Sequence, residues 1–238
     1  MLGRFLEISI TTSDIRASVE FYERLGFSQC TTADIWPHPY GVLTDGRLFL
    51  GLHQYRFASP ALTFVRPEIA RHTAEFTALG IELAFAKTGD DSFNEIGFRD
   101  PAGQMITILE ARTFSTNERG PRDLSHCGWF ADYSIPTTDF AAAARFWERL
   151  GFVAMEESDT SYVQLPIVGD GLSLALHRLQ TLDRPMLVFR DNQMRERIAQ
   201  LKARGLAFSA ELPRGLDRGA NALLDSPEGT ALLLLEEL

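Results

Sequence analysis

The chain has 238 residues, of which 45% are hydrophobic and 23% charged, which is enough for one large domain or two domains of about 120 residues. The net charge of −9 argues against non-specific nucleic-acid binding and against an anionic membrane surface, because both favour basic proteins. No signal-peptide pattern or membrane-spanning run is visible, and Cys30 and Cys127 have no CxxC spacing, so we expect free thiols in a cytoplasmic protein.

The first half of the chain alternates strand and helix signals. Apolar and polar residues alternate from Phe5 to Thr11, as in a strand, and Asp14 is the expected N-cap of a helix that runs to Leu25. Gly26 suits a left-handed residue that closes this helix. Strands are then expected near 27–31, 40–44 and 48–53, with Asp45-Gly46 as a tight hairpin turn. The pattern restarts with a strand at 61–65, a helix from Pro67 to Leu79 closed by Gly80, and strands near 82–87, 93–98 and 105–110.

The second half repeats the first at an offset of about 125 residues. The expected first helix ends in Phe-Tyr-Glu-Arg-Leu-Gly-Phe at Phe27, and a second copy ends in Phe-Trp-Glu-Arg-Leu-Gly-Phe at Phe152. Later pairs keep the same order: Leu48 to His53 with Leu172 to His177, and Asp100-Pro101-Ala102-Gly103 with Ser226-Pro227-Glu228-Gly229. We predict domains at 1–115 and 128–238, joined by a linker at 116–127 that is rich in polar residues, Gly and Pro.

These motifs resemble the vicinal oxygen chelate superfamily, which includes glyoxalase I, extradiol dioxygenases, fosfomycin-modifying enzymes and bleomycin-resistance proteins. The similarity lies in the strand, the polar turn and the helix closing in Phe-Tyr-x-x-Leu-Gly-Phe, followed by Asp-Pro-x-Gly before a last strand. It implies an α+β fold of four β-α-β-β-β modules in two tandem glyoxalase-like domains. The mixed sheet of each domain is then expected to form a cup, with a ligand or metal on its concave face.

Most of the metal-ligand positions that the resemblance implies are empty in this sequence. The first-strand position falls at Glu7 and Asp132, and the other three fall at Gly51, Ala61 and Thr107 in the first half and at Ala175, Met186 and Leu233 in the second. One carboxylate beside small or apolar residues cannot close a site for a divalent transition metal. We therefore predict no metal and no other cofactor. If the alignment is shifted by two residues, His53 falls at one of these ligand positions, and Glu7 with His53 could then form a weak metal site.

Ten residues are the candidates for chemistry or binding. Glu7 and Asp132 lie at equivalent strand positions, where a partly buried carboxylate would have a raised pKa and act as a catalytic base, or would only order the strand through hydrogen bonds. An aromatic loop from Trp36 to Tyr40 suits stacking on a planar ligand, or packing over a sheet edge. The predicted ligand-binding residues are Ser9, Trp36, His38, Tyr40, His53, Thr107, Ser134 and His177.

Three functions stay open on the sequence alone. The first is a metal-free cup that binds a small aromatic or amphipathic molecule. The second is an enzyme of the glyoxalase type, a lyase, isomerase or dioxygenase with a relocated metal or a carboxylate base. The third is a protein-interaction module whose cups are filled by side chains. We expect a small-molecule partner, no nucleic acid or membrane partner, and a monomer or homodimer.

Overall fold

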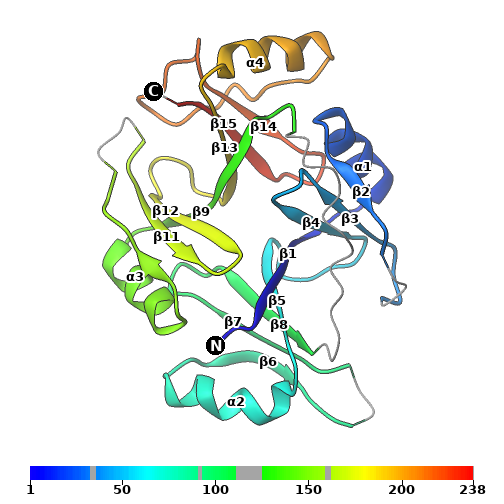
Figure 1. The fold of residues 1–238 in the computed structure, drawn as a ribbon, viewed down its shortest axis with the longest axis vertical. Coiled ribbons are helices and arrows are strands. Elements are labelled where there is room, and N and C mark those ends of the chain that lie inside the picture. The colour runs from blue at the N-terminus through cyan, green and yellow to red at the C-terminus, as the bar shows by residue number, and fades with distance from the viewer. Residues whose placement is uncertain (33–35, 91–92, 111–124, 159–161, 238) are drawn as a thin grey trace.

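Two mixed β-sheets with two helices each make up the protein (Figure 1). The structure is a computed structural model that describes residues 1–32, 36–90, 93–110, 125–158 and 162–237. The strands of the first sheet end at Glu110 and those of the second begin at Trp129. Residues 116–124 of the predicted linker, 116–127, lie outside the described residues, so its boundaries stay a prediction. No helix among the described residues is long and apolar enough to cross a membrane.

The first sheet contains eight strands in the order β2-β3-β4-β1-β5-β8-β7-β6. Its elements are β1 (Arg4–Thr11), α1 (Ile15–Arg24), β2 (Ser28–Cys30), β3 (Tyr40–Thr44), β4 (Phe49–His53), β5 (Ala61–Arg66), α2 (Ile69–Ala78), β6 (Leu83–Lys87), β7 (Glu95–Arg99) and β8 (Met105–Glu110). β1 pairs with β4 in parallel and with β5 antiparallel, so the two central strands join two β-α-β-β-β modules into one sheet. Every element predicted for this half is present.

The second sheet contains seven strands in the order β10-β11-β12-β9-β13-β15-β14. Its elements are β9 (Trp129–Thr137), α3 (Phe140–Arg149), β10 (Val153–Ala154), β11 (Gln164–Gly169), β12 (Leu172–Arg178), β13 (Met186–Asp191), α4 (Met194–Ala203), β14 (Ala222–Asp225) and β15 (Ala231–Glu236). β9 takes the place of β1, since it pairs in parallel with β12 and antiparallel with β13. The topology of the first half is thus repeated.

One predicted strand is missing from the second half. The last module has β13, α4, β14 and β15, and the segment between α4 and β14 forms a loop where the first half has β6. Pro213 in this segment has no backbone N–H to donate to a ladder, and a single backbone bond, from Ser209 N to Leu223 O at 2.8 Å, ties it to β14. The prediction of a complete fourth module was therefore wrong in this strand.

The helix and turn signals of the first half act as the sequence predicts. Asp14 caps α1, because its Oδ1 accepts hydrogen bonds from the backbone N–H groups of Arg16 and Ala17, both at 3.1 Å. Gly26 follows the helix with a φ of 88°, a left-handed conformation that favours glycine. Asp45 Oδ1 accepts from the N–H of Arg47 at 3.0 Å and thereby shapes the hairpin turn between β3 and β4.

The helix-side faces of both sheets share one hydrophobic core. The helices also contact the other half: in Figure 1, α1 lies beside β14 and β15. Tyr22 on α1 donates from its hydroxyl to Glu228 in the β14–β15 turn at 2.8 Å. In the mirrored contact, Trp147 on α3 donates from Nε1 to Asp100 in the β7–β8 turn at 3.2 Å. Sheet pairing therefore stays within each half, whereas the helix contacts join the halves.

Candidate functional site

The face of each sheet that points away from its helices holds the candidate residues. Strand side chains alternate between faces, and in β1 the buried Ile8 and Ile10 belong to the shared core. Glu7 and Ser9 therefore point to the opposite face, which we call the first cup. Its members also include Gly51, His53, Thr63 and Thr107. The equivalent face of the second sheet, with Asp132, Ser134, Ala175, His177, Val188 and Leu233, is called the second cup.

Glu7 lies at the centre of a hydrogen-bonded cluster in the first cup. Its side chain is almost fully buried, with 2% of the residue exposed. Oε1 accepts from Ser9 Oγ at 2.8 Å and lies 3.2 Å from His53 Nε2, while Oε2 accepts from the Tyr40 hydroxyl at 2.6 Å. Burial and the neighbouring Glu7 carboxylate raise the pKa of Tyr40, so the phenol keeps its proton and donates it. Both carboxylate oxygens of Glu7 thus have donors.

A chain of side-chain contacts leads from this carboxylate toward the surface. The Nδ1 atom of His53 lies 3.0 Å from Nε2 of the half-buried His38. Burial, together with the neighbouring His53, lowers the pKa of His38, so His38 is neutral at pH 7. The two ring nitrogens of His53 therefore face different partners, His38 on one side and Glu7 on the other.

Aromatic rings gather above the Glu7 cluster. The ring of Trp36 stacks on His38 with centroids 5.5 Å apart and meets the ring of His53 edge-on at 5.4 Å. Tyr55 stacks on His38 at 4.9 Å and is 59% exposed, so it forms the outer edge of the group. Phe93 lies beside Trp36 in the same group of rings, with the two ring centroids 5.5 Å apart. The predicted aromatic loop, from Trp36 to Tyr40, thus lies over the first cup.

The second cup has a different surface, because apolar residues replace hydroxyl groups. In the first cup Thr63 lies opposite Thr107 in the ladder, and Thr63 Oγ1 lies 2.7 Å from Ser9 Oγ. The corresponding pair in the second cup is Val188 and Leu233, both fully buried. These two belong to a small apolar cluster with Tyr162, Leu182, Met186, Leu223, Ala231 and Leu235. The second cup is therefore filled by its own side chains.

Asp132 is buried in this apolar surrounding with few partners. Its Oδ1 has no hydrogen-bond partner among the described residues, unlike either oxygen of Glu7. Burial raises the pKa of Asp132 to about 7, against the opposing effect of the Arg190 charge. Glu7 and Asp132 hold equivalent strand positions, but only Glu7 lies in a site built from donors.

His177 belongs to a fully internal chain of hydrogen bonds. Ser134 Oγ lies 2.8 Å from the Tyr162 hydroxyl and 2.8 Å from His177 Nδ1, and His177 Nε2 donates to the Leu182 carbonyl at 2.9 Å. Burial lowers the pKa of His177 to about 4, so its ring is neutral at pH 7. Because every polar atom of this ring has a partner within the protein, the geometry fits a structural role for Ser134 and His177.

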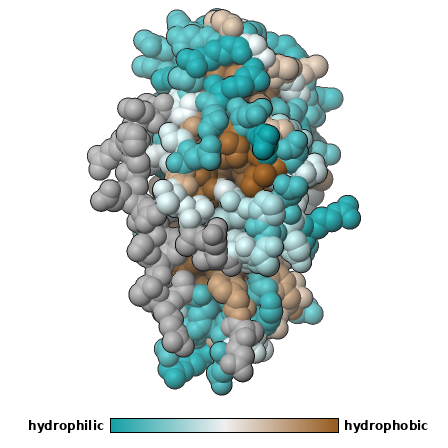
Figure 2. All heavy atoms as spheres, turned by 90° about the vertical axis from the view of Figure 1, so that its right-hand side faces the viewer, coloured by the Kyte–Doolittle hydropathy of each residue, from teal (hydrophilic) through white to brown (hydrophobic). Residues whose placement is uncertain are grey.

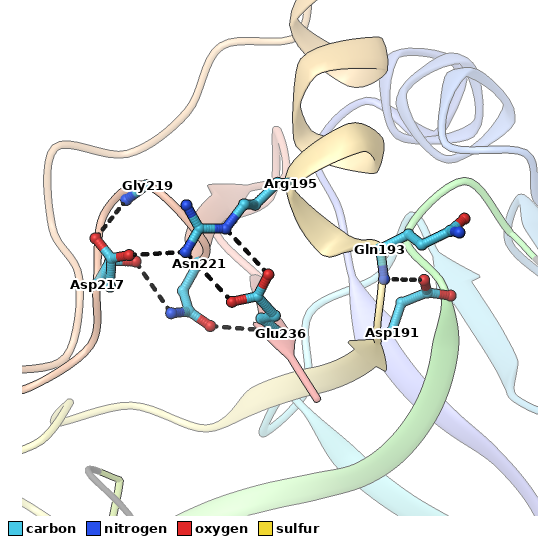
Figure 3. A network of polar contacts seen from close by, with 7 residues as sticks. All are labelled: Asp191, Gln193, Arg195, Asp217, Gly219, Asn221 and Glu236. Atoms are coloured by element: carbon cyan, nitrogen blue, oxygen red, sulfur yellow. Dashed lines mark hydrogen bonds and ion pairs between the residues drawn. The ribbon is translucent and has the colours of Figure 1, made fainter. Parts of the chain in front are cut away.

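A loop between α4 and β14 covers the second cup. Its residues Leu212 and Leu216 pack against the apolar cluster. Figure 3 shows how the base of the loop is fixed: Asn221 donates to the Asp217 carbonyl at 3.0 Å and accepts from the Glu236 N–H at 2.9 Å. Arg195 on α4 adds ion pairs to Asp217 and Glu236. The missing fourth-module strand is thus replaced by an anchored cover.

The donor sets of both cups do not fit the metal site of the resembled family. A Cβ atom on Gly51 would lie 1.9 Å from Glu7 Oε1, so the Glu7 carboxylate itself fills the space of that absent ligand. Glu7 and His38 contact opposite ring nitrogens of His53 and cannot converge on one ion. Within the described residues, no group of three or more His, Cys, Asp or Glu side chains is arranged to hold a metal.

Six of the ten candidate residues come together in one cluster: Glu7, Ser9, Trp36, His38, Tyr40 and His53. Thr107 shares their face of the sheet beside Thr63. The sequence reasoning missed Tyr55, Phe93 and Thr63. Thr63 was detectable in principle, since it alternates with Ala61 on a predicted strand, whereas the two rings come from loops whose position the sequence does not determine.

Comparisons with known proteins support the fold. No family model matches the sequence, and no curated protein matches it significantly. Among solved structures, the chain resembles a catechol 2,3-dioxygenase with a TM-score of 0.60 and 14% identity, covering 97% of this chain and 86% of that one. It also resembles homoprotocatechuate 2,3-dioxygenase from Brevibacterium fuscum with a TM-score of 0.61 and 17% identity, covering 97% of this chain and 70% of that one.

These similarities extend over both halves of the chain. The enzyme from Brevibacterium fuscum is an extradiol ring-cleaving dioxygenase, a class that the sequence resemblance includes. The chain shares the fold of both dioxygenases, and the fold that the resemblance implies is thereby confirmed. At these identities the comparison shows the fold alone, so the function has to be argued from the cups themselves.

Proposed function

We propose that the first cup binds a small aromatic or amphipathic molecule without a metal. The observation that carries this proposal is the buried Glu7 carboxylate, held by Ser9, Tyr40 and His53 beneath a group of aromatic rings. Flat apolar walls with a few fixed polar groups are the usual composition of small-molecule sites. The second cup, closed by apolar side chains, takes no part in the proposal.

The ligand is expected to enter between the rings. Because Glu7 is only 2% exposed, a molecule reaches its carboxylate only if the ring cluster around Trp36 and His38 shifts outward. A planar molecule can then stack on these rings, while a hydroxyl or N–H group of the ligand donates to Glu7 in place of Tyr40 or Ser9. The proposed ligand is therefore a planar aromatic compound that carries at least one hydrogen-bond donor.

The test is thermal-shift screening against planar aromatic compounds with and without a hydroxyl or amine donor. Ligands that bind only the native state raise the melting temperature, and we expect this for the donor-bearing compounds. Tyr40→Phe should change the size of the shift, whereas Tyr162→Phe, which removes a hydroxyl from the second cup, should leave it unchanged relative to its own ligand-free baseline. No shift with any donor-bearing compound, or equal effects of both variants, would defeat the proposal.

A second candidate function is favoured by the contact chain from His38 through His53 to Glu7. Such a chain can carry a proton between solvent and a buried carboxylate, which suits an isomerase or lyase with a carboxylate base. Glu7→Gln and His53→Gln would then abolish turnover while binding persists. If each variant loses ligand affinity by the same factor as it loses turnover, Glu7 and His53 act only in binding, and the enzymatic function is not supported.

A further inference from the structure

A cavity of about 940 Å³ lies between the two halves and shares no lining residue with the Glu7 cluster. Its walls are the beginnings of β1 and β9 and the hairpin turns β3–β4 and β11–β12. These four segments are two repeat-related pairs, 4–6 with 129–131 and 45–49 with 169–173. The volume is within the range of about 300–1,000 Å³ that small-molecule sites have.

The two repeat-related walls differ in chemistry. Arg4 in the first half corresponds to Trp129 in the second, and the turn with Arg47 corresponds to one with Gly171. The first half therefore contributes two guanidinium groups to the cavity, and the second contributes an indole ring that is 45% exposed. The positively charged groups are concentrated on one wall as a result.

Arg47 is held in an arrangement that suits an anion. Its guanidinium lies over the face of the Trp129 ring, as in a cation–π contact. Within the described part of the chain, this guanidinium has no hydrogen bond or ion pair to a side chain. Neighbouring Asp45 does not neutralise it by contact, because the buried Asp45 Oδ1 instead accepts from the backbone N–H groups of Arg47 and Leu48.

A guanidinium that lies over an aromatic face can keep its N–H groups in a plane parallel to the ring. These N–H groups then remain available to a carboxylate, which matches the guanidinium fork with two parallel hydrogen bonds. Next to it, Phe5, Phe49 and Phe130 add flat apolar surface to the cavity. A cation and an aromatic wall thus lie in the same cavity.

We propose that this cavity is a second binding site, specific for planar aromatic anions such as aromatic carboxylates. The ring of the ligand packs against the phenylalanine and tryptophan side chains, and its carboxylate binds the Arg47 guanidinium. Asp170 lies in the β11–β12 turn on the opposite wall, and its negative charge disfavours a ligand whose carboxylate points to that wall. The site is formed only when both halves are present, since each half supplies one wall.

Calorimetric titration with 2-naphthoate tests the proposal, with methyl 2-naphthoate, which has neither a charge nor a hydrogen-bond donor, as the matched probe. Arg47→Met should weaken naphthoate binding at least about tenfold and leave the ester unaffected, because it removes the bidentate contact and keeps an apolar chain over the indole. Arg71→Met, which removes the same charge from the exposed surface of α2, is the control and should change neither affinity. Trp129→Leu should weaken both probes.

The outcome separates this site from the first cup. Under the proposal, Tyr40→Phe leaves naphthoate affinity unchanged, since Tyr40 lies outside the cavity. The proposal is overturned if the wild-type chain does not bind naphthoate, if Arg47→Met and Arg71→Met have equal effects, or if Tyr40→Phe rather than Arg47→Met removes binding. Far-ultraviolet circular dichroism of each variant checks that it is folded.

Discussion

The two buried carboxylates of the cups differ by one methylene group, and the strand beside each one differs in a matching way. Glu7 lies over Gly51, with its carboxylate in the space that a Cβ atom would occupy. The shorter Asp132 has Ala175 at the equivalent position, where β12 runs beside β9. Because Glu7 is longer and faces a glycine, its carboxylate reaches across β4 to Tyr40 and His53. The Oδ1 atom of Asp132 has no hydrogen-bond partner among the described residues.

Gly51→Ala should therefore disturb the Glu7 cluster. The added Cβ would lie 1.9 Å from Glu7 Oε1, which forces the carboxylate away from its donors, and we expect a loss of stability of about 1–3 kcal/mol. Gly41→Ala on the neighbouring strand is the control, because its Cβ would meet only Ile15 Cδ1 at 3.8 Å. Urea denaturation of both variants measures the difference. Equal stability of the two would show that Glu7 does not need the space over Gly51.

Asp132 should make stability depend on pH with a defined sign. Its pKa is raised in the folded state from the ordinary value of 3.8 to about 7, so the folded chain holds the proton more tightly than the unfolded chain. The stabilisation is fully present below about pH 4 and is lost as the pH rises toward 7, by an amount on the order of 4 kcal/mol. Asp132→Asn should gain stability relative to wild type over this interval.

The measurement is the free energy of unfolding of both proteins from pH 4 to pH 8. The titration of His177, whose pKa is lowered to about 4, is common to both proteins and cancels in the difference. Asp170→Asn, at an exposed turn position, is the control and should show a flat difference. A difference between Asp132→Asn and wild type that also stays flat would mean that the Asp132 carboxyl is not desolvated.

At the scale of elements, the loop in place of the predicted strand between α4 and β14 covers the second cup. Its anchor Asn221 is 9% exposed and uses both ends of its amide, whereas Arg195 makes its ion pairs with a side chain that is 54% exposed. Buried hydrogen bonds with fixed partners stabilise more than exposed ion pairs do. Asn221 is thus the stronger of the two anchors shown in Figure 3.

Asn221→Ala should loosen the cover of the second cup. Loss of both amide contacts leaves the Glu236 N–H without its acceptor, and we expect a cost of about 2 kcal/mol together with faster amide hydrogen exchange over residues 205–221. Arg195→Met should cost less than about 1 kcal/mol and leave the exchange nearly unchanged. Faster exchange in Arg195→Met than in Asn221→Ala would reverse this order of anchors.

The sequence predicts most elements because their local signals agree with the fold. Asp14 as a cap, Gly26 as a left-handed residue and Asp45-Gly46 as a turn act through contacts a few residues apart, which a sequence displays directly. The missing strand before β14 and the ring of Tyr55 above His38 depend on contacts between distant segments. The candidate site was predictable to the same extent: the positions on β1 and β4 were found, while the difference between the polar first cup and the apolar second cup was not.

At the scale of the whole molecule, the two halves depend on each other. One hydrophobic core runs through both, and contacts such as Tyr22 to Glu228 and Trp147 to Asp100 cross between them. Figure 2 shows one face of the molecule, mostly hydrophilic, with apolar atoms recessed in its middle. Separation of the halves would bring the core surfaces that join them into water.

The halves should therefore unfold together. We expect a single calorimetric transition for the full chain, and fragments 1–115 and 128–238 that aggregate or stay unfolded alone because each exposes its part of the shared core. Mixed fragments should regain structure, as followed by circular dichroism. Two separate transitions, or a stable monomeric fragment, would show that the cross-contacts contribute little.

The most direct test of the account is a crystal structure of the chain with the donor-bearing aromatic compound that gives the largest thermal shift. The account predicts density for the compound in the first cup, with a donor on Glu7 and the rings of Trp36 and His38 displaced, while Leu212 and Leu216 still cover the second cup. Density in the second cup, with the first cup unchanged, would contradict it.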